Sequence, residues 1–304
     1  MCGIVGYVGA RPATPILVEG LRRLEYRGYD SAGLAVIQEG RIYVRRDVGK
    51  LSALEALLTR EPVEGCIGIG HTRWATHGRP CQRNAHPHTD CRGEIVVIHN
   101  GIVENFRALR QELEAKGHRL SSDTDTEVIV HLVEAYMDGG LDLEEAARRA
   151  LGRIAGAHSV VLMSSREPDK LIAARLGNAG GVVIGMGRGE MFVASDMPAI
   201  LEHTRDMIFL EDRQMAAITA EGARCKWLDG TPFAPEIRTV PWDPVSAAKG
   251  EYKHFMQKEI LEQARSITDN IRGRVDFESG QVFLNELNLS PESLRAFHKM
   301  YIVA

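Results

Sequence analysis

The first residues of the chain carry a candidate nucleophile. Cys2 follows Met1, so removal of the methionine would leave a residue with both a thiol and a free α-amine. An α-amine has a pKa of about 7.7 to 8.0 and a cysteine thiol one of about 8.5, so near neutral pH the amine can accept the thiol proton. We therefore interpret Cys2 as an N-terminal nucleophile with its own general base. The alternative is a small residue at an ordinary chain start, and the Met-Cys pair alone does not separate the two.

Other positions supply the groups that an acyl-transfer site needs. Asn100 and Gly101 end a buried-strand pattern, where a side-chain amide and a closely approached backbone N–H can stabilise an oxyanion. Arg73 can hold a carboxylate in a bidentate pair, and Asp125, at a helix start, can hold an ammonium. Together these groups describe an amino acid with a reactive side-chain carbonyl. Each also has a structural alternative: a turn for Asn-Gly, an ion pair for Arg73, helix-dipole compensation for Asp125 and core packing for Trp74.

Apolar periodicity and turn residues predict the elements that must position these groups. Residues 4–8 read as a strand that would bury the chain start against a sheet and keep the nucleophile from fraying. Residues 66–70 and 95–99 read as strands that lead into the segments containing Arg73 and Asn100. Further strands are predicted at 32–37, 41–46, 159–163, 171–175, 182–185, 190–194, 208–210 and 215–219, and helices at about 14–27, 52–60, 105–116, 127–139 and 143–154.

Two helix starts are predicted from capping residues. Thr14 with Pro15 behind it has the pattern of an N-cap followed by a first-turn proline, and Gly28 that of a helix stop. The stretch 124–127, Thr-Asp-Thr-Glu, has the spacing of a capping box with Glu127 at the third helical position.

Two glycine-containing stretches are predicted as hairpin turns. Glu39-Gly40 separates two strand patterns. The stretch Gly185–Gly189 has the glycine density of a phosphate-binding loop, but it lies between two strand patterns with no helix after it. A hairpin turn is therefore favoured over a nucleotide site.

Composition restricts the class of protein and partner. The 304 residues are 44% hydrophobic and 26% charged, which is typical of a globular protein with a sizeable core. A formal net charge of −4 disfavours nucleic acid and anionic membranes as partners. The sequence has no apolar run of membrane-spanning length and no basic segment ahead of an apolar stretch at its start, so we expect a cytoplasmic protein.

Five scattered cysteines do not suggest a disulfide framework in a chain of this length. The stretch Cys81–Cys91 contains two cysteines and two histidines, which are zinc-type ligands. Their spacing matches no familiar zinc motif, so a polar loop over a pocket is favoured and no metal site is predicted.

Prolines divide the chain. Pro232, Pro235, Pro241 and Pro244 indicate a linker after the first domain. We expect a first domain at 2–240, a linker at 241–250, and a helix over about 251–271 that opens an incomplete second domain at 251–304. The apolar end of the chain, Met300–Val303, reads as a strand of that second, α/β domain.

Five motifs in order resemble the glutaminase domain of the glutamine–fructose-6-phosphate aminotransferase (isomerising) family, the glucosamine-6-phosphate synthases. They span residues 2 to about 240, and residues 252–259 resemble the connection to that family's sugar-isomerase half. The motifs are Cys-Gly-Ile-Val-Gly at 2–6, Arg-Leu-Glu-Tyr-Arg-Gly-Tyr-Asp-Ser-Ala-Gly at 23–33, His-Thr-Arg-Trp-Ala-Thr-His-Gly at 71–78, His-Asn-Gly at 99–101 and Thr-Asp-Thr-Glu at 124–127.

The resemblance implies an α+β fold: a four-layer αββα N-terminal-nucleophile hydrolase sandwich, followed by a linker helix and a truncated α/β sugar-isomerase domain. It implies a class II glutamine amidotransferase that forms a glutamyl thioester and releases ammonia. No metal or organic cofactor is implied. The implied residues are Cys2 as nucleophile, Asn100 and Gly101 as oxyanion hole, Arg73, Thr76, His77 and Asp125 as glutamine ligands, Trp74 on a mobile loop, and Arg27 and Gly28 as supports.

The partners implied are L-glutamine and, through the sugar-isomerase half, fructose 6-phosphate, in a homo-oligomeric full-length enzyme. The chain as given would then be a glutaminase only. One stretch, Leu176–Gly181, departs from the Gly-Ser-Pro expected from the family. Two alternatives stay open: another class II amidotransferase, such as an amidophosphoribosyltransferase, or a catalytically silent regulatory module.

Overall fold

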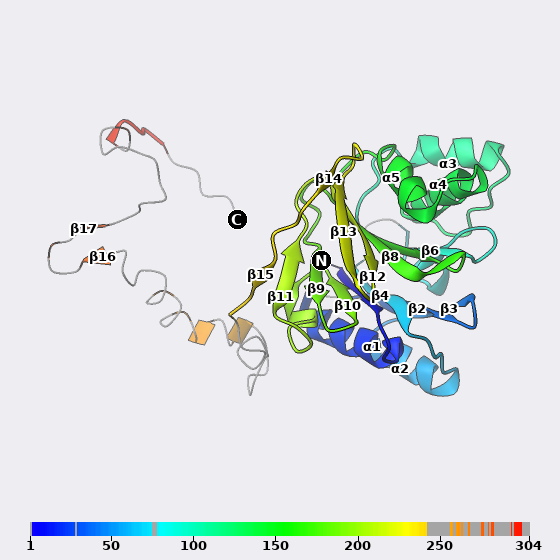
Figure 1. Ribbon diagram of the computed structural model, residues 1–304, viewed down its shortest axis with the longest axis horizontal. Coiled ribbons are helices and arrows are strands. Elements are labelled where there is room, and N and C mark those ends of the chain that lie inside the picture. Colours follow the sequence, from blue (N-terminus) through cyan, green and yellow to red (C-terminus); the bar gives the residue numbers. More distant parts are fainter. Residues whose placement is uncertain are drawn as a thin grey trace. The chain divides into compact units, whose positions relative to one another are not determined.

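The computed structural model describes residues 2–27, 29–74 and 78–241, and seventeen residues scattered between 256 and 299. The chain divides into two compact units, residues 1–248 and 249–304. In its described residues the first unit contains two antiparallel sheets and five α-helices (Figure 1).

The first sheet has eight strands in the order β15-β11-β9-β10-β1-β4-β2-β3. Its centre is β1 (Gly3–Val8), all of whose residues are buried, paired with β4 and β10 on its two sides. The other strands are β2 (Ser31–Gln38), β3 (Arg41–Val48), β4 (Ile67–Arg73), β9 (Val183–Met186), β10 (Met191–Ala194), β11 (Asp206–Phe209) and β15 (Arg238–Thr239).

The second sheet has seven strands in the order β14-β13-β12-β8-β7-β6-β5. Its member β6 (Ile95–Gly101) is the predicted apolar strand that ends in Asn-Gly. The other strands are β5 (His88–Thr89), β7 (His158–Ser164), β8 (Glu167–Leu176), β12 (Gln214–Thr219), β13 (Gly222–Trp227) and β14 (Pro232–Phe233).

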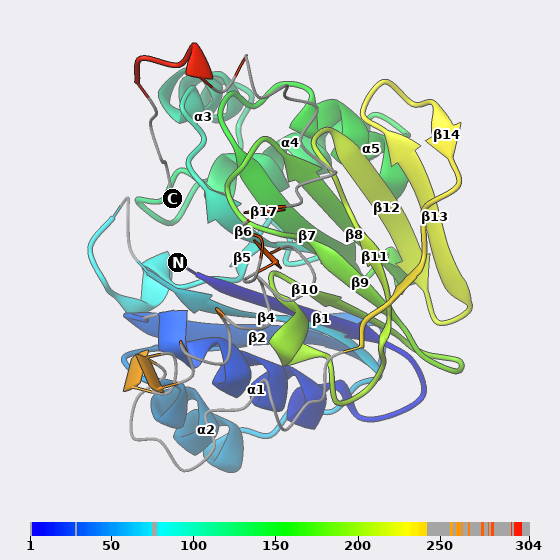
Figure 2. The same ribbon diagram turned by 90° about the vertical axis from the view of Figure 1, so that its left-hand side faces the viewer.

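Three apolar cores hold four layers together, and Figure 2 shows the layers edge-on. The helices α1 (Ala13–Leu24) and α2 (Leu51–Arg60) cover the outer face of the first sheet. The helices α3 (Phe106–Ala115), α4 (Glu127–Asp138) and α5 (Leu143–Leu151) cover the outer face of the second. The third core lies between the sheets. The predicted αββα sandwich is therefore confirmed for the first unit.

Both capping predictions are wrong. The helix α1 begins at Ala13 after Pro12, and the Thr14 hydroxyl donates to the Val63 carbonyl at 2.8 Å instead of capping the helix. The helix α4 begins at Glu127 itself, so Glu127 is not at its third position. Its buried carboxylate instead accepts hydrogen bonds from the backbone and hydroxyl groups of Ser121 and Ser122. Thr14 therefore bonds to a segment distant in the chain, and Glu127 to residues just ahead of its own helix.

Both hairpin predictions are confirmed. The turn between β2 and β3 has Glu39 and Gly40 at φ values of 50° and 74°, the left-handed region that a tight two-residue turn requires. The strands β9 and β10 pair antiparallel around the glycine-rich stretch at 185–189. The short strands β5, β14 and β15 and the more polar β13 were not predicted. Three 3₁₀ turns, at Glu25–Arg27, Gln82–Asn84 and Met197–Ala199, complete the first unit.

In the second unit, the described residues between 256 and 267 are helical, within the predicted helix at 251–271. Two short strands, β16 (Val275–Asp276) and β17 (Gln281–Val282), pair antiparallel. The predicted linker beyond 241 and the predicted strand Met300–Val303 lie outside the described residues. Across the described part of the chain, no helix is both long and apolar enough to cross a membrane.

Candidate active site

One cavity of about 400 Å³ lies where β1, β4 and β6 bring their functional ends together. Its wall combines the start of the chain with residues that precede α4 and with the loop after β8. The lining residues are Cys2, Arg73, Trp74, His86, His99, Asn100, Gly101, Ile102, Thr124, Asp125, Thr126, Ala179 and Gly180.

The backbone around Cys2 is held by side chains from three other strands or loops. Thr72 accepts a hydrogen bond from the Gly3 N–H at 3.2 Å, and Ser195 accepts one from the Ile4 N–H at 3.0 Å. The Asn100 side-chain amide donates to the Cys2 carbonyl at 3.0 Å. These bonds and the pairing of β1 on both sides position the chain start as firmly as an internal strand.

The Cys2 thiol lies inside the cavity wall. Burial raises the pKa of this thiol, while the Trp74 backbone N–H, which donates to Sγ at 3.1 Å, and the Arg73 guanidinium act in the opposite direction. A base is therefore needed to generate the thiolate near neutral pH. The Trp74 side chain is 55% exposed, so it is not a core residue.

Asn100 and Gly101 offer two donors on the same side of the cavity as Cys2. The Asn100 Oδ1 atom lies 3.0 Å from His71 Nε2, which fixes the amide so that its Nδ2 group points toward Cys2. Gly101 has φ of 132°, and a Cβ at this position would lie 2.2 Å from the Ala157 carbonyl oxygen. Only glycine fits there, as expected for a backbone N–H that a substrate approaches closely.

Arg73 and Asp125 carry opposite charges on the wall of this cavity. The buried Arg73 side chain donates to the Gly78 carbonyl at 3.0 Å and lies 3.9 Å from the Asp30 carboxylate. The buried Asp125 carboxylate accepts a hydrogen bond from the Val103 N–H at 2.7 Å. A pair of fixed, opposite charges is suited to the carboxylate and ammonium of an amino acid.

The remaining predicted site residues have no described side chain. Gly28, Thr76 and His77 lie outside the described residues, and so does the side chain of Arg27, whose backbone belongs to the 3₁₀ turn at Glu25–Arg27. Their predicted roles stay predictions.

A layer of buried histidines at and behind the cavity wall was not predicted. Burial lowers the pKa of His71 to about 4, of His88 to about 3 and of His158 to about 4. The rings form polar contacts rather than ion pairs: His99 lies 2.9 Å from the Thr126 hydroxyl and 3.0 Å from His158. The signal available in the sequence was the placement of His71 and His99 within otherwise apolar or glycine-rich strand patterns.

The stretch that departs from the family pattern forms part of the wall. Ala179 and Gly180 line the cavity, and the Gly180 carbonyl accepts a hydrogen bond from the Ser159 hydroxyl at 3.2 Å. The Cys81–Cys91 stretch passes the cavity at His86 and ends near α4.

A glutamine amidotransferase domain family matches residues 71–202, which include Arg73, Asn100, Gly101 and Asp125. This segment of the chain is therefore a glutamine amidotransferase domain match. Over its whole length the chain is 50% identical to the glutamine–fructose-6-phosphate aminotransferase (isomerizing) of Symbiobacterium thermophilum, of which it covers 49%. It is 48% identical over 276 residues to the protein of that name from Pyrococcus horikoshii, covering 90% of this chain and 46% of that protein. The chain thus spans about half the length of the curated relatives it matches.

Solved structures show the same fold. The chain resembles glutamine phosphoribosylpyrophosphate amidotransferase from B. subtilis with a TM-score of 0.64 and 27% identity, over 75% of this chain and 49% of that one. A class II glutamine aminotransferase domain protein from Silicibacter pomeroyi matches with a TM-score of 0.51 and 22% identity, over 75% of this chain and 99% of that one. The fold is therefore that of the class II amidotransferases.

Proposed function

We propose that this chain hydrolyses L-glutamine, with Cys2 as the nucleophile once Met1 is removed. The observation that supports the proposal most strongly is that one cavity collects the Cys2 thiol, the amide donor of Asn100 and the opposite charges of Arg73 and Asp125. These residues come from separate parts of the chain, and their meeting at one point matches the needs of acyl transfer from an amino acid.

The proposed reaction has two acyl-transfer steps. The Cys2 α-amine takes the thiol proton, and the thiolate attacks the glutamine side-chain carbonyl carbon. Asn100 Nδ2 and the Gly101 N–H donate to the resulting oxyanion. The carbon–nitrogen bond then breaks, the nitrogen takes the proton from the α-amine and leaves as ammonia, and a glutamyl thioester remains. Water, deprotonated by the same amine, attacks the thioester and releases glutamate and the free thiol.

Binding of glutamine is assigned to the charges at the cavity wall. Arg73 would pair with the substrate carboxylate and Asp125 with its ammonium, which places the side-chain carbonyl at the opposite end, toward Cys2. Thr76 and His77 are proposed as further ligands, Trp74 as part of the loop that closes over the substrate, and Arg27 and Gly28 as supports, on the strength of the resemblance alone.

The acceptor of the ammonia is proposed from the relatives. Proteins 44–50% identical to this chain are named glutamine–fructose-6-phosphate aminotransferases. We infer that 2–240 is the glutaminase domain, 241–250 a linker and 251–304 the start of a sugar-isomerase domain that converts fructose 6-phosphate to glucosamine 6-phosphate. A cytoplasmic, homo-oligomeric whole protein is also inferred. The amidophosphoribosyltransferase alternative is less favoured, because that likeness has only 27% identity.

The test is glutamate release from L-glutamine by the untagged chain, measured together with its intact mass. We expect release from protein that lacks Met1, none from Cys2→Ala, and an unchanged rate in the matched control Cys66→Ser, because Cys66 is exposed and does not line the cavity. Release by Cys2→Ala at the wild-type rate would refute the assignment. A glutamine-mimicking electrophile that leaves a free Cys2 unmodified would favour the silent-module alternative.

A further inference from the structure

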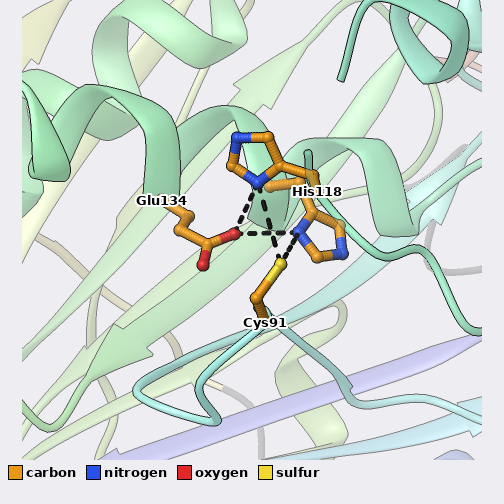
Figure 3. A group of neighbouring side chains, drawn as sticks. Cys91, His118 and Glu134 are labelled. Carbon is orange, nitrogen blue, oxygen red and sulfur yellow. Dashed lines mark hydrogen bonds and ion pairs between the residues drawn. The ribbon is translucent and has the colours of Figure 1, made fainter. Parts of the chain in front are cut away.

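Four metal-type ligands converge at the edge of the second sheet, outside the candidate active site. Cys91 follows β5, His118 follows α3, and His131 and Glu134 lie on α4. A spacing of three residues places His131 and Glu134 on one face of that helix. Figure 3 shows Cys91, His118 and Glu134 pointing toward one another. One ligand atom from each of the four residues lies within 4.8 Å of all the others.

The distances suit a small tetrahedral ion. Cys91 Sγ lies 3.6 Å from His131 Nδ1 and 3.8 Å from His118 Nδ1. Zinc–ligand bonds of about 2.3 Å to sulfur and 2.0–2.1 Å to nitrogen at tetrahedral angles give a sulfur–nitrogen separation of about 3.6 Å. Glu134 Oε2 lies 2.7 Å from His118 Nδ1 and 3.0 Å from His131 Nδ1. A tetrahedral ion needs about 3.4 Å between these atoms, so the carboxylate would move outward by about 0.5 Å.

The surroundings of the cluster resemble the outer shell of a structural metal site. The Arg119 N–H donates to Cys91 Sγ at 3.4 Å. The buried His131 Nε2 atom accepts or donates no hydrogen bond but lies 3.8 Å from the Glu127 carboxylate. Metal-ligating histidines typically direct their second ring nitrogen toward such a carboxylate. Oδ2 of the neighbouring Asp90 is also buried without a hydrogen bond.

We propose that Cys91, His118, His131 and Glu134 form a structural Zn²⁺ site. A thiolate, two imidazoles and a carboxylate favour zinc over calcium or magnesium, and four protein ligands leave no open position for catalysis. On binding, the Cys91 thiol loses its proton to solvent, and both histidines bind through Nδ1 with the proton on Nε2. The dication then balances one thiolate and one carboxylate, so the site is neutral.

The ion would link three segments that no strand pairing connects. These are the chain after β5, the connection between α3 and α4, and one face of α4. That connection continues from His118 to Thr124 and Asp125, which line the candidate active site. Cys91 is exposed, which gives an ion a route from solvent. The Cys81–Cys91 stretch therefore contributes one ligand, whereas its other candidates, Cys81, His86 and His88, are not part of the group.

The test is titration of the chelator-treated full chain with Co²⁺, with Zn²⁺ as competitor, in a Cys2→Ala background that removes the active-site thiol. We expect one Co²⁺ per chain, a thiolate-to-cobalt charge-transfer band, tetrahedral d–d absorption, and loss of all of these on adding Zn²⁺. Cys91→Ser should abolish the charge-transfer band and weaken the affinity by more than the roughly 10- to 100-fold typical of outer-shell changes. His118→Gln should weaken it as well.

The matched controls are Cys81→Ser and Cys66→Ser, which remove thiols outside the cluster and should leave the titration unchanged. Circular dichroism verifies that each variant is folded, and Cys91 is exposed enough for serine to be accommodated. Absence of stoichiometric binding would overturn the proposal. A charge-transfer band that survives Cys91→Ser in a folded chain would overturn it too.

Discussion

Mild acid should destabilise the first unit because of the histidine layer behind the cavity. His71 and His88 are fully buried, and burial lowers their pKa values to about 4 and about 3. In the unfolded chain a histidine titrates near 6.5. Between these values the unfolded state binds protons that the folded state does not. The stability contributed by neutral histidines is therefore complete above about pH 6.5 and is lost as the pH falls toward the folded pKa.

The size of the effect follows from linkage. At pH 5 the solution is about 1.5 pH units below the pKa of an unfolded histidine, so protonation stabilises the unfolded state by about 2 kcal/mol per histidine. The folded state gains almost nothing, because its histidine pKa values are lower still. His71 and His88 together should lower the free energy of unfolding by about 4 kcal/mol between pH 7 and pH 5. That is a large share of the 5–15 kcal/mol typical of a domain. His131 acts in the opposite direction: burial lowers its pKa, but the nearby Glu127 and Glu134 carboxylates outweigh burial and raise it.

The assay is denaturant unfolding at pH 7 and pH 5, followed by tryptophan fluorescence, on wild type and His88→Gln. A glutamine side chain can still hydrogen-bond Thr124, which His88 contacts at 3.0 Å, but it cannot titrate. The pH-dependent loss should therefore shrink by about 2 kcal/mol in the variant. His298→Gln is the matched control, because His298 is exposed, and should not change the loss. An equal loss in His88→Gln and wild type would refute the reasoning.

Three substitutions at the candidate active site have distinct expected outcomes. Asn100→Ala should lower kcat for glutamate release by about 10²- to 10³-fold, in steady-state kinetics, because one oxyanion donor is lost; a kcat within a factor of two of wild type would contradict this role. Asp125→Asn should raise KM for glutamine by about 10- to 100-fold through the lost charge on the ammonium partner, and an unchanged KM would exclude Asp125 from substrate binding. Gly101→Ala should lower the free energy of unfolding by about 1 to 3 kcal/mol, measured by chemical denaturation, because a Cβ meets the Ala157 carbonyl at 2.2 Å; wild-type stability would show that the backbone relaxes.

Much of the fold could be predicted because its central strands are locally distinctive. The apolar runs at 4–8 and 95–99 correspond to β1 and β6, the strands that carry Cys2 and Asn100. The hairpin at Glu39-Gly40 was predictable because its two residues adopt the left-handed conformation that selects this kind of turn. In these segments, local preference and tertiary environment favour the same structure.

Prediction was wrong where a side chain found another partner. Thr14 bonds to Val63, which the sequence does not place beside it, and Glu127 bonds to Ser121 and Ser122 just ahead of its helix instead of taking the third helical position. The metal-type cluster shows the same limit. Cys91 was recognised as a possible ligand, but its partners His118 and Glu134 come from the α3–α4 connection and from α4. Spacing along the chain carries no information about such a meeting until the fold is known.

The histidine layer explains how a polar cavity can exist at one end of the apolar space between two packed sheets. Toward the middle of the sandwich the space between the sheets is filled by aliphatic side chains such as Ile4, Val96 and Ile98. At the cavity end, His71 takes over on this face and lies 3.0 Å from the Asn100 side-chain oxygen, while His99, on the opposite face of β6, lies 2.9 Å from the Thr126 hydroxyl; burial keeps both rings neutral. A charged group in their place would have to be desolvated and would compete with the substrate.

Because the buried histidines are neutral, the electrostatic selection of the substrate depends on two charged residues, Arg73 and Asp125. Among the described residues that line the cavity, Arg73 and Asp125 are the ones with a formal charge. A ligand with both a carboxylate and an ammonium can pair with both residues, whereas a simple amide can pair with neither. Selection for a free amino acid would therefore arise from Arg73 and Asp125, without competition from the nearby histidines, which burial keeps neutral.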